Sequence, residues 1–348
     1  MAFDNNYSYL EDIDSLSGLT GGSRNDTAAN DKPAAPLIEN HIQQASRKRI
    51  DNLTRTLMDT YVLATAMDTG EIYCYDETRG IFVNNGKAIV EQQAEAMCST
   101  VSEKEINEVI GHIRRRTPSE REEFDKNIEW LVCKNCMINL KTLQTTPHSP
   151  DFMVTVQIPV RYEESVSDFA SFFNLAGDNG VKYHCSPCPS IMKFMHEVMS
   201  ADDVETVLDF VAYCLWRGLP FHKYLLFNGS GRNGKGVMLG LIKRFLGFIN
   251  VSGESLHRLL ENRFATAEIH GKLANIDADM SKEALKNTGV LKKLTGGDYI
   301  PAEKKYHSPF KFVNYAKLIF SANQIPITPD ETDAFFDSLV TCNNDNLS

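Results

Sequence analysis

The sequence predicts an α/β core preceded by a smaller α+β module, and three features of the 348-residue chain indicate this fold. First, an apolar run beginning at Tyr224 leads through a glycine-rich loop into a helical pattern. Second, the apolar runs 272–277 and 316–322 have the length of buried strands. Third, residues 47–188 mix helical spacing with short hairpin-like runs. The module is therefore expected over residues 47–188, and the core, beginning with a helical segment, over residues 189–348.

Composition places the chain among ordinary globular proteins, with 42% hydrophobic and 24% charged residues. Its net charge of −10 argues against a protein that coats nucleic acid with its whole surface, but a local basic channel stays compatible with it. Residues 1–46 are rich in Asn, Asp, Ser and Gly, which predicts a disordered tail. No apolar run approaches the ~20 residues of a membrane span, and no signal peptide opens the chain. We therefore expect a cytoplasmic protein without a membrane partner.

The module between the tail and the core has its own helical and strand patterns. Ile50, Leu53 and Leu57 have helical spacing, and Ser102 with Glu105 forms the sequence of a capping box. The expected elements are a helix from Arg47, a hairpin of residues 71–75 and 81–83, a helix after Ser102, a helix over 119–131 and a strand over 152–158.

Two CxxC pairs, Cys133–Cys136 and Cys185–Cys188, each have the spacing of zinc ligands. They lie about 50 residues apart, whereas a compact zinc ribbon separates its pairs by roughly 15–20 residues. The first pair also lies in an apolar run, where cysteine behaves as a small core residue. Reduced core thiols are favoured over a shared zinc site, which stays an alternative.

The glycine-rich loop has the pattern G-x-x-x-x-G-K between a strand and a helix, which is the context of a phosphate-binding P-loop. Loop amides and the helix N-terminus would face the phosphates, and Lys235 would reach the β- and γ-phosphates of ATP. The helix is expected to bury Val237, Leu241 and Phe245 and to end at Gly247. Gly236 and Val237 stand where a Ser or Thr hydroxyl usually binds Mg²⁺. The ATP-binding residues expected are Gly229, Ser230, Gly231, Arg232, Asn233, Gly234, Lys235, Gly236 and Val237.

A further helix is expected from Ser255 to Phe264, and polar side chains end the two strands that follow. Asp277 and Asp279 end the first strand, where one carboxylate would hold Mg²⁺ and the other would polarise the attacking water, with either able to be the metal ligand. Asn323 ends the second strand and could orient the γ-phosphate or the water. Between these strands, a predicted hairpin carries Lys304, Lys305 and His307 around an aromatic residue, a combination that suits a nucleic-acid single strand. A solvated hairpin is the alternative for that last pattern.

In this order, the stretches GSGRNGKG, KLANIDAD, LKKLTGGDYIPAEKKYHSPFKF and LIFSANQIP resemble the superfamily 3 helicases of viruses, phages and plasmids. The chain is most similar to the C-terminal ATPase of the phage and plasmid primase-helicases, including the poxvirus group, over roughly residues 61–336. The resemblance implies an AAA+-type ATPase core with a helical collar, usually assembled as a hexameric ring around single-stranded DNA. It also implies that Lys235, Asp277, Asp279 and Asn323 are catalytic and that Lys304, Lys305 and His307 line the pore.

The function expected is an ATP- and Mg²⁺-dependent DNA helicase of a virus, phage or plasmid, acting inside the host cell with a primase or other replication proteins. The stretch 337–348 contains no Arg where the family supplies an arginine finger, so a truncated end and weak hydrolysis are expected. One alternative is therefore an assembly or regulatory subunit that binds nucleotide but does not hydrolyse it. A small-molecule P-loop kinase is another, against which the hairpin and Asn323 argue.

Overall fold

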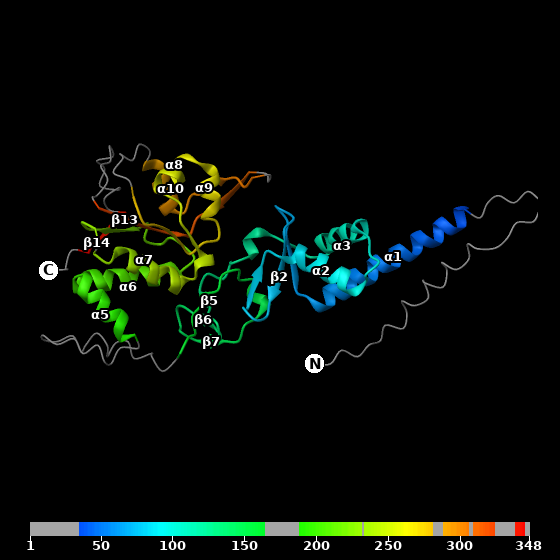
Figure 1. Ribbon diagram of the computed structural model, residues 1–348, viewed down its shortest axis with the longest axis horizontal. Helices are drawn as coiled ribbons and strands as arrows, with labels where there is room; N and C mark the ends of the chain where they lie inside the picture. The colour runs from blue at the N-terminus through cyan, green and yellow to red at the C-terminus, as the bar shows by residue number, and fades with distance from the viewer. Residues whose placement is uncertain are drawn as a thin grey trace, which may run out of the picture. The chain divides into compact units, whose positions relative to one another are not determined.

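The computed structural model describes residues 35–163, 188–231, 233–280, 288–305, 309–323 and 338–344 (Figure 1). The chain divides into the compact units 1–49 and 50–348. Helix α1 (Ala35–Thr60) begins in the first unit, so a helix starts earlier than the apolar spacing from Arg47 predicts. Among the described residues, no helix combines the length and the apolar character that crossing a membrane requires.

The first part of the larger unit is an α+β arrangement. A four-stranded sheet has the order β3-β2-β1-β4. The capping box predicted at Ser102 is confirmed, because the Ser102 side chain accepts from the Glu105 amide and the Glu105 carboxylate accepts from the Ser102 amide. The hairpin, the helix through Ile50 and Leu57 and the helix after Ser102 are also confirmed, whereas the helix Gly86–Met97 was not predicted. The elements are β1 (Leu63–Ala66), β2 (Ile72–Asp76), β3 (Ile81–Val83), α2 (Gly86–Met97), α3 (Glu103–Arg116) and β4 (Pro118–Ser119).

Two predicted elements of the module are wrong. The helix expected over 119–131 is replaced by a 3-10 turn at Arg121–Glu123 and by the strand β5 (Trp130–Val132). The backbone of Asp125 has φ of +57°, which no α-helix accommodates. The strand expected over 152–158 is absent from the described residues apart from a single bridge at Gln157, since Met153 also has a positive φ. The sheet here consists of β5, β6 (Met137–Asn139) and β7 (Thr145–Thr146).

The core is a five-stranded sheet with the order β14-β8-β13-β10-β9, in which every neighbouring pair is parallel. Both faces are covered, which explains the continuous apolar runs of its central strands. On β8, Leu225 and Phe227 pack into one cluster, whereas Tyr224 and Leu226 pack into the other. The strands are β8 (Tyr224–Asn228), β9 (Val251–Ser252), β10 (Ala274–Asp277), β13 (Lys317–Ala322) and β14 (Leu339–Asn343).

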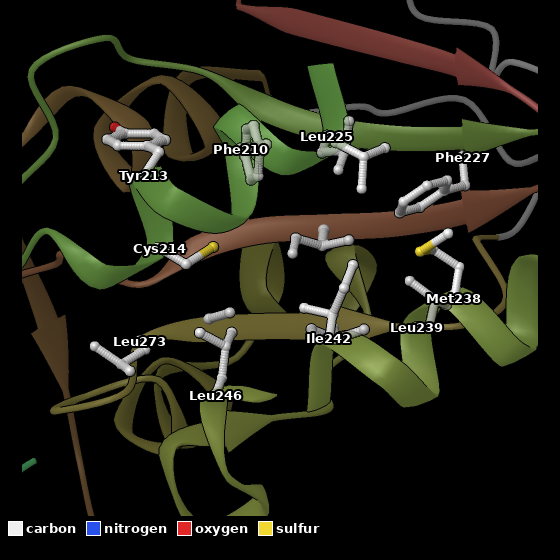
Figure 2. Close-up of a cluster of buried hydrophobic side chains, with 14 of the residues drawn as sticks. Phe210, Tyr213, Cys214, Leu225, Phe227, Met238, Leu239, Ile242, Leu246 and Leu273 are labelled. Carbon is white, nitrogen blue, oxygen red and sulfur yellow. The ribbon is translucent and has the colours of Figure 1, made fainter. Parts of the chain in front are cut away.

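Helices lie on both faces of this sheet (Figure 1). The face with α5 (Pro189–Val198), α6 (Ala201–Leu215) and α7 (Lys235–Leu246) contains the cluster in Figure 2, where side chains of β8 and α7 share one side of the sheet. The opposite face carries α8 (Leu256–Glu261), α9 (Arg263–Glu268), α10 (Thr288–Gly296) and the antiparallel hairpin of β11 (Tyr299–Ala302) and β12 (Phe310–Val313).

Two details of these helices correct the sequence prediction. Helix α7 buries Met238, Leu239, Ile242 and Leu246 rather than the predicted face, and Val237 is 58% exposed. The single helix expected from Ser255 to Phe264 is split at Asn262, whose side chain accepts from the Phe264 amide and caps α9. Cys133, Cys136 and Cys188 pack in or against the same apolar cluster. Cys185 lies outside the described residues, so the zinc alternative stays untested.

Candidate functional site

The glycine-rich loop connects the end of β8 to the first residue of α7. Gly231 and Gly234 have φ of +103° and +86°, the region that favours glycine. A Cβ at Gly234 would also lie 3.0 Å from Val198 and 3.3 Å from Phe194. Because α7 begins at Lys235, its first amides face the space enclosed by the loop. The loop therefore depends on glycine for its path and presents the positive end of a helix.

Lys235 is only 8% exposed and folds back over this loop. Its ammonium Nζ donates to the Gly229 carbonyl at 2.6 Å and to Asn233 Oδ1 at 3.1 Å. These bonds compensate the burial of the charge and hold it beside the helix N-terminus. Of the other predicted loop residues, Ser230, Gly231, Gly236 and Val237 are exposed, and Arg232 lies outside the described residues.

Asp277 is the last residue of β10, and its carboxylate is only partly satisfied. One oxygen, Oδ1, accepts from the Asp279 amide at 3.3 Å. The other, Oδ2, is buried and has no hydrogen-bond partner within the described part of the chain. Burial raises the pKa of Asp277, and the nearby Asp279 carboxylate raises it further. A bound cation would relieve both penalties, so the residues fit a Mg²⁺ ion, with Asp277 better placed than the exposed Asp279.

Asn323 follows β13, the strand between β8 and β10. Ala322 pairs with Asn228 at the end of β8, and Phe320 pairs with Asp277 at the end of β10. Because all three strands are parallel, the loop, the acidic pair and Asn323 share the carboxyl edge of the sheet. Tertiary structure thus brings together groups that lie far apart in the sequence. Such an edge, in open α/β sheets, is where ligands bind.

Three asparagines at this edge were missed by sequence reasoning. Asn228 Nδ2 donates to Asn343 Oδ1 at 3.3 Å, and the Asn344 amide donates to the Asn228 carbonyl at 3.0 Å. Asn344 is fully buried, and neither polar atom of its side chain has a partner among the described residues. The strand β14 that positions it was not predicted. Its β-branched pair Val340–Thr341 was the only available signal.

The predicted nucleic-acid residues lie elsewhere. Lys304 and Lys305 are exposed and follow β11, in the connection to β12. His307 lies outside the described residues. Burial lowers the pKa of the His270 imidazole, and the charges of Arg121 and Lys304 contribute to the same shift. His270 precedes β10, so these groups are at the amino edge of the sheet, opposite the glycine-rich loop.

Comparison with known proteins finds two family models and a viral relative. Residues 37–200 match the family described as "D5 N terminal like", and residues 227–335 match DUF5906, described as a family of unknown function. A protein of Acanthamoeba polyphaga mimivirus, named "Putative helicase L207/L206", is 23% identical over 218 residues. Together, the D5 N-terminal-like match and the viral relative support a relationship of this chain to the phage and viral primase-helicases. The alignment covers 60% of this chain and 21% of the mimivirus protein, so the chain spans only part of that relative's length.

Solved structures give weaker likenesses to this chain. The A form of the apo NrS-1 C-terminal region has a TM-score of 0.46 and 12% identity, over 85% of this chain and 61% of that one. JCV Helicase bound to an acetamide compound has a TM-score of 0.32 and 14% identity, over 51% of this chain and 50% of that one.

Proposed function

We propose that this chain is an ATP-hydrolysing motor that moves on single-stranded DNA during replication. The observation that carries the proposal is the shared carboxyl edge of β8, β13 and β10, the edge from which the glycine-rich loop with Lys235, Asn323 and Asp277 all extend. A glycine-rich loop with a buried lysine, an acidic strand end and a polar residue between them are the parts a P-loop ATPase needs. The strand order supports an AAA+-type core, with α5 and α6 as its helical collar.

Each residue at this edge has a role that follows from its position. Lys235 would exchange its bonds to Gly229 and Asn233 for bonds to the β- and γ-phosphates, at no cost of burying a new charge. Asp277 would hold the Mg²⁺, which neutralises phosphate charge when bound. The exposed Asp279 would accept a proton from the attacking water, and Asn323 would orient that water. ATP binding would involve the loop residues Gly229 to Val237.

The partners proposed follow the same assignment. Lys304, Lys305 and His307 would contact a single strand through phosphate charge and an aromatic face. A homo-oligomeric ring, hexameric in the expected form, would place these hairpins around the strand. Other replication proteins, a primase among them, would act with this motor inside the host cell.

The test is ATP hydrolysis by the purified chain, with and without single-stranded DNA, beside Lys235→Ala and Lys193→Ala. Lys193 is the matched control because it lies on α5 with a side chain that is 65% exposed. We expect DNA-stimulated turnover that falls by about 10²–10³-fold in Lys235→Ala, the loss typical of one transition-state charge, and that survives in Lys193→Ala.

Other outcomes would contradict this function. Nucleotide binding without turnover would identify a regulatory or assembly subunit instead. A turnover rate that DNA does not stimulate, and that the double variant Lys304→Ala with Lys305→Ala retains, would favour a P-loop kinase. No binding of ATP at all would remove the nucleotide site.

A further inference from the structure

A cleft of about 620 Å³ lies at the amino edge of the parallel sheet, away from the glycine-rich loop. One wall comes from the α+β part and includes Tyr73, Arg79 and Phe124. The other comes from the core, with Lys272 just before β10 and Tyr315 just before β13. Both walls belong to the unit 50–348.

The walls are joined by polar contacts that hold the cleft open. Arg217 Nη1 lies 3.2 Å from Asp125 Oδ1, and its Nη2 donates to the Asn127 carbonyl at 2.7 Å. Asn250 Nδ2 donates to the Gln157 carbonyl, also at 2.7 Å. Because the guanidinium of Arg217 is almost fully buried, this ion pair is a structural joint. The cleft is therefore pre-organised for a ligand.

The charge of the cleft is opposite to that of the protein. The whole chain carries −10, yet the described acidic residues of the lining are Glu122 and Asp125, and Asp125 is already paired with Arg217. Arg121 is paired with Asp68. The basic residues that line it are Arg79, Arg121, Lys126, Arg217, Lys272, Lys304 and Lys311. A local concentration of cations in an acidic protein is what a bound polyanion requires.

The pKa values agree with this crowding of like charges. Burial, together with the charges of Arg121 and Lys304, lowers the pKa of His270 to about 4. Burial also lowers the pKa of Lys272, and the charge of Lys304 adds to the effect while Glu268 opposes it. These groups come from three separate segments and converge on one place. An anion placed there would relieve their mutual repulsion.

Aromatic side chains are interleaved with these cations. Tyr73 and Phe124 contact each other with ring centroids 4.7 Å apart, and His270 contacts Phe312 at 4.8 Å. Tyr299, on β11, also lines the cleft and is 69% exposed. An exposed aromatic face next to phosphate-binding lysines provides a surface on which a base can stack. A small inorganic anion would not use this ring.

We propose that the cleft binds a single-stranded nucleic acid, with Lys126, Lys272 and Lys311 on its phosphates and a base stacked on Tyr299. The inference rests on the proposed function, since Lys304 belongs both to the hairpin and to this cleft. It goes further than that function because the bound nucleic acid would continue from the β11–β12 hairpin onto the α+β part of the chain. The α+β part would then contact the nucleic acid directly.

The experiment measures binding of a fluorescently labelled oligothymidylate to the full chain by anisotropy over a series of salt concentrations. The test variants are Lys126→Ala combined with Lys311→Ala, and Tyr299→Ala; the controls are Lys193→Ala and Tyr299→Phe. We expect the double lysine variant to lower the salt slope by about 0.7 for each phosphate that is no longer neutralised. Tyr299→Ala should weaken binding about 5- to 150-fold, the range for one stacked base, and Tyr299→Phe should restore it.

Two outcomes would overturn the inference. If the cleft variants bind like the parent chain while Lys304→Ala with Lys305→Ala fails to bind, the hairpin alone holds DNA; the proposed function then stands and the cleft does not. If inorganic pyrophosphate displaces the oligonucleotide from the cleft and the Tyr299 variants are unaffected, the cleft is a small-anion site. DNA binding absent from the parent chain would instead contradict the proposed function itself.

Discussion

The two edges of the parallel sheet differ in how their charges are arranged. At the carboxyl edge, a positive and a negative side chain each lie on an element of the core. Lys235 donates to a carbonyl and an amide oxygen of the loop, and Asp277 is the last residue of β10. At the amino edge, like charges converge from both walls of the cleft. The first arrangement suits a compact ligand with its own cation, ATP with Mg²⁺, whereas the second suits an extended polyanion. One sheet can thus present two chemically distinct sites because its strands all run the same way.

This difference also separates local from assembled sites. The loop from Gly229 to Lys235 is a single stretch that folds on a strand and a helix beside it. The cleft is assembled from residues between Tyr73 and Tyr315 and depends on the joint at Arg217. Substitutions at the joint should therefore affect the amino edge and leave nucleotide binding to the glycine-rich loop nearly unchanged, provided the chain stays folded.

The largest effect is expected at the joint. Arg217→Met leaves the Asp125 carboxylate without its ion-pair partner, which should lower the free energy of unfolding by about 3–5 kcal/mol, the loss typical of a broken buried pair. Chemical denaturation of the full chain measures it. Adding Asp125→Asn should recover part of the stability, because no charge is then left unpaired. Equal stability of the parent and Arg217→Met chains would show that the walls are not joined by this pair.

A smaller effect is expected for Asp277→Asn, which should lower the rate of ATP hydrolysis without lowering thermal stability. Hydrolysis should fall by about 10²–10³-fold, because the amide cannot bind the cation. Thermal stability at pH 7 should stay equal or increase. The folded pKa of Asp277 is raised, so its stabilising contribution is present below the unfolded value and is lost as pH rises through the folded pKa.

Asp279→Asn is the control, since that carboxylate is exposed and its removal should leave thermal stability unchanged. A drop in melting temperature for Asp277→Asn would mean that the charged carboxylate stabilises the fold by itself, which would contradict the role of its Oδ2 oxygen as a cation ligand.

The smallest effect is a pH dependence at Lys317, which is buried just inside the amino edge. Its ammonium donates to the Trp216 carbonyl and lies 4.6 Å from the Tyr213 ring centre. Burial lowers its pKa to about 7. Between this value and the unfolded value of 10.5, the unfolded chain binds more protons, so stability rises with pH.

Denaturation midpoints at pH 7, 8 and 9 measure this rise, which Lys317→Met should flatten. Above pH 9 the buried Cys214 thiol lowers the free energy of unfolding as pH rises, because burial raises its pKa to about 12 in the folded chain. A slope in Lys317→Met as steep as in the parent chain would contradict the assignment; Lys193→Met should retain the parent slope.

Local patterns predicted the structure well wherever neighbouring residues decide it. The capping box at Ser102 and the loop before Lys235 depend on hydrogen bonds and φ angles of a few consecutive residues. The segments 119–131 and 152–158 were mispredicted because their apolar spacing does not reveal the positive φ of Asp125 and Met153. Asp125 also accepts from the amide and the hydroxyl of Thr155, a contact 30 residues away in the sequence.

The chain's own sequence thus determined a glycine-rich loop between a strand and a helix, an acidic strand end and a lysine-bearing hairpin, because each is a short-range arrangement of residue types. Only the tertiary structure decided that Asp277, and not the exposed Asp279, has a buried oxygen without a hydrogen-bond partner among the described residues. It also decided that Asn344 lies at the same edge of the sheet and that a basic cleft lies at the amino edge. The physical reason is the parallel sheet. It sorts the ends of distant strands onto two edges, and no pattern along the chain records which residues will meet there.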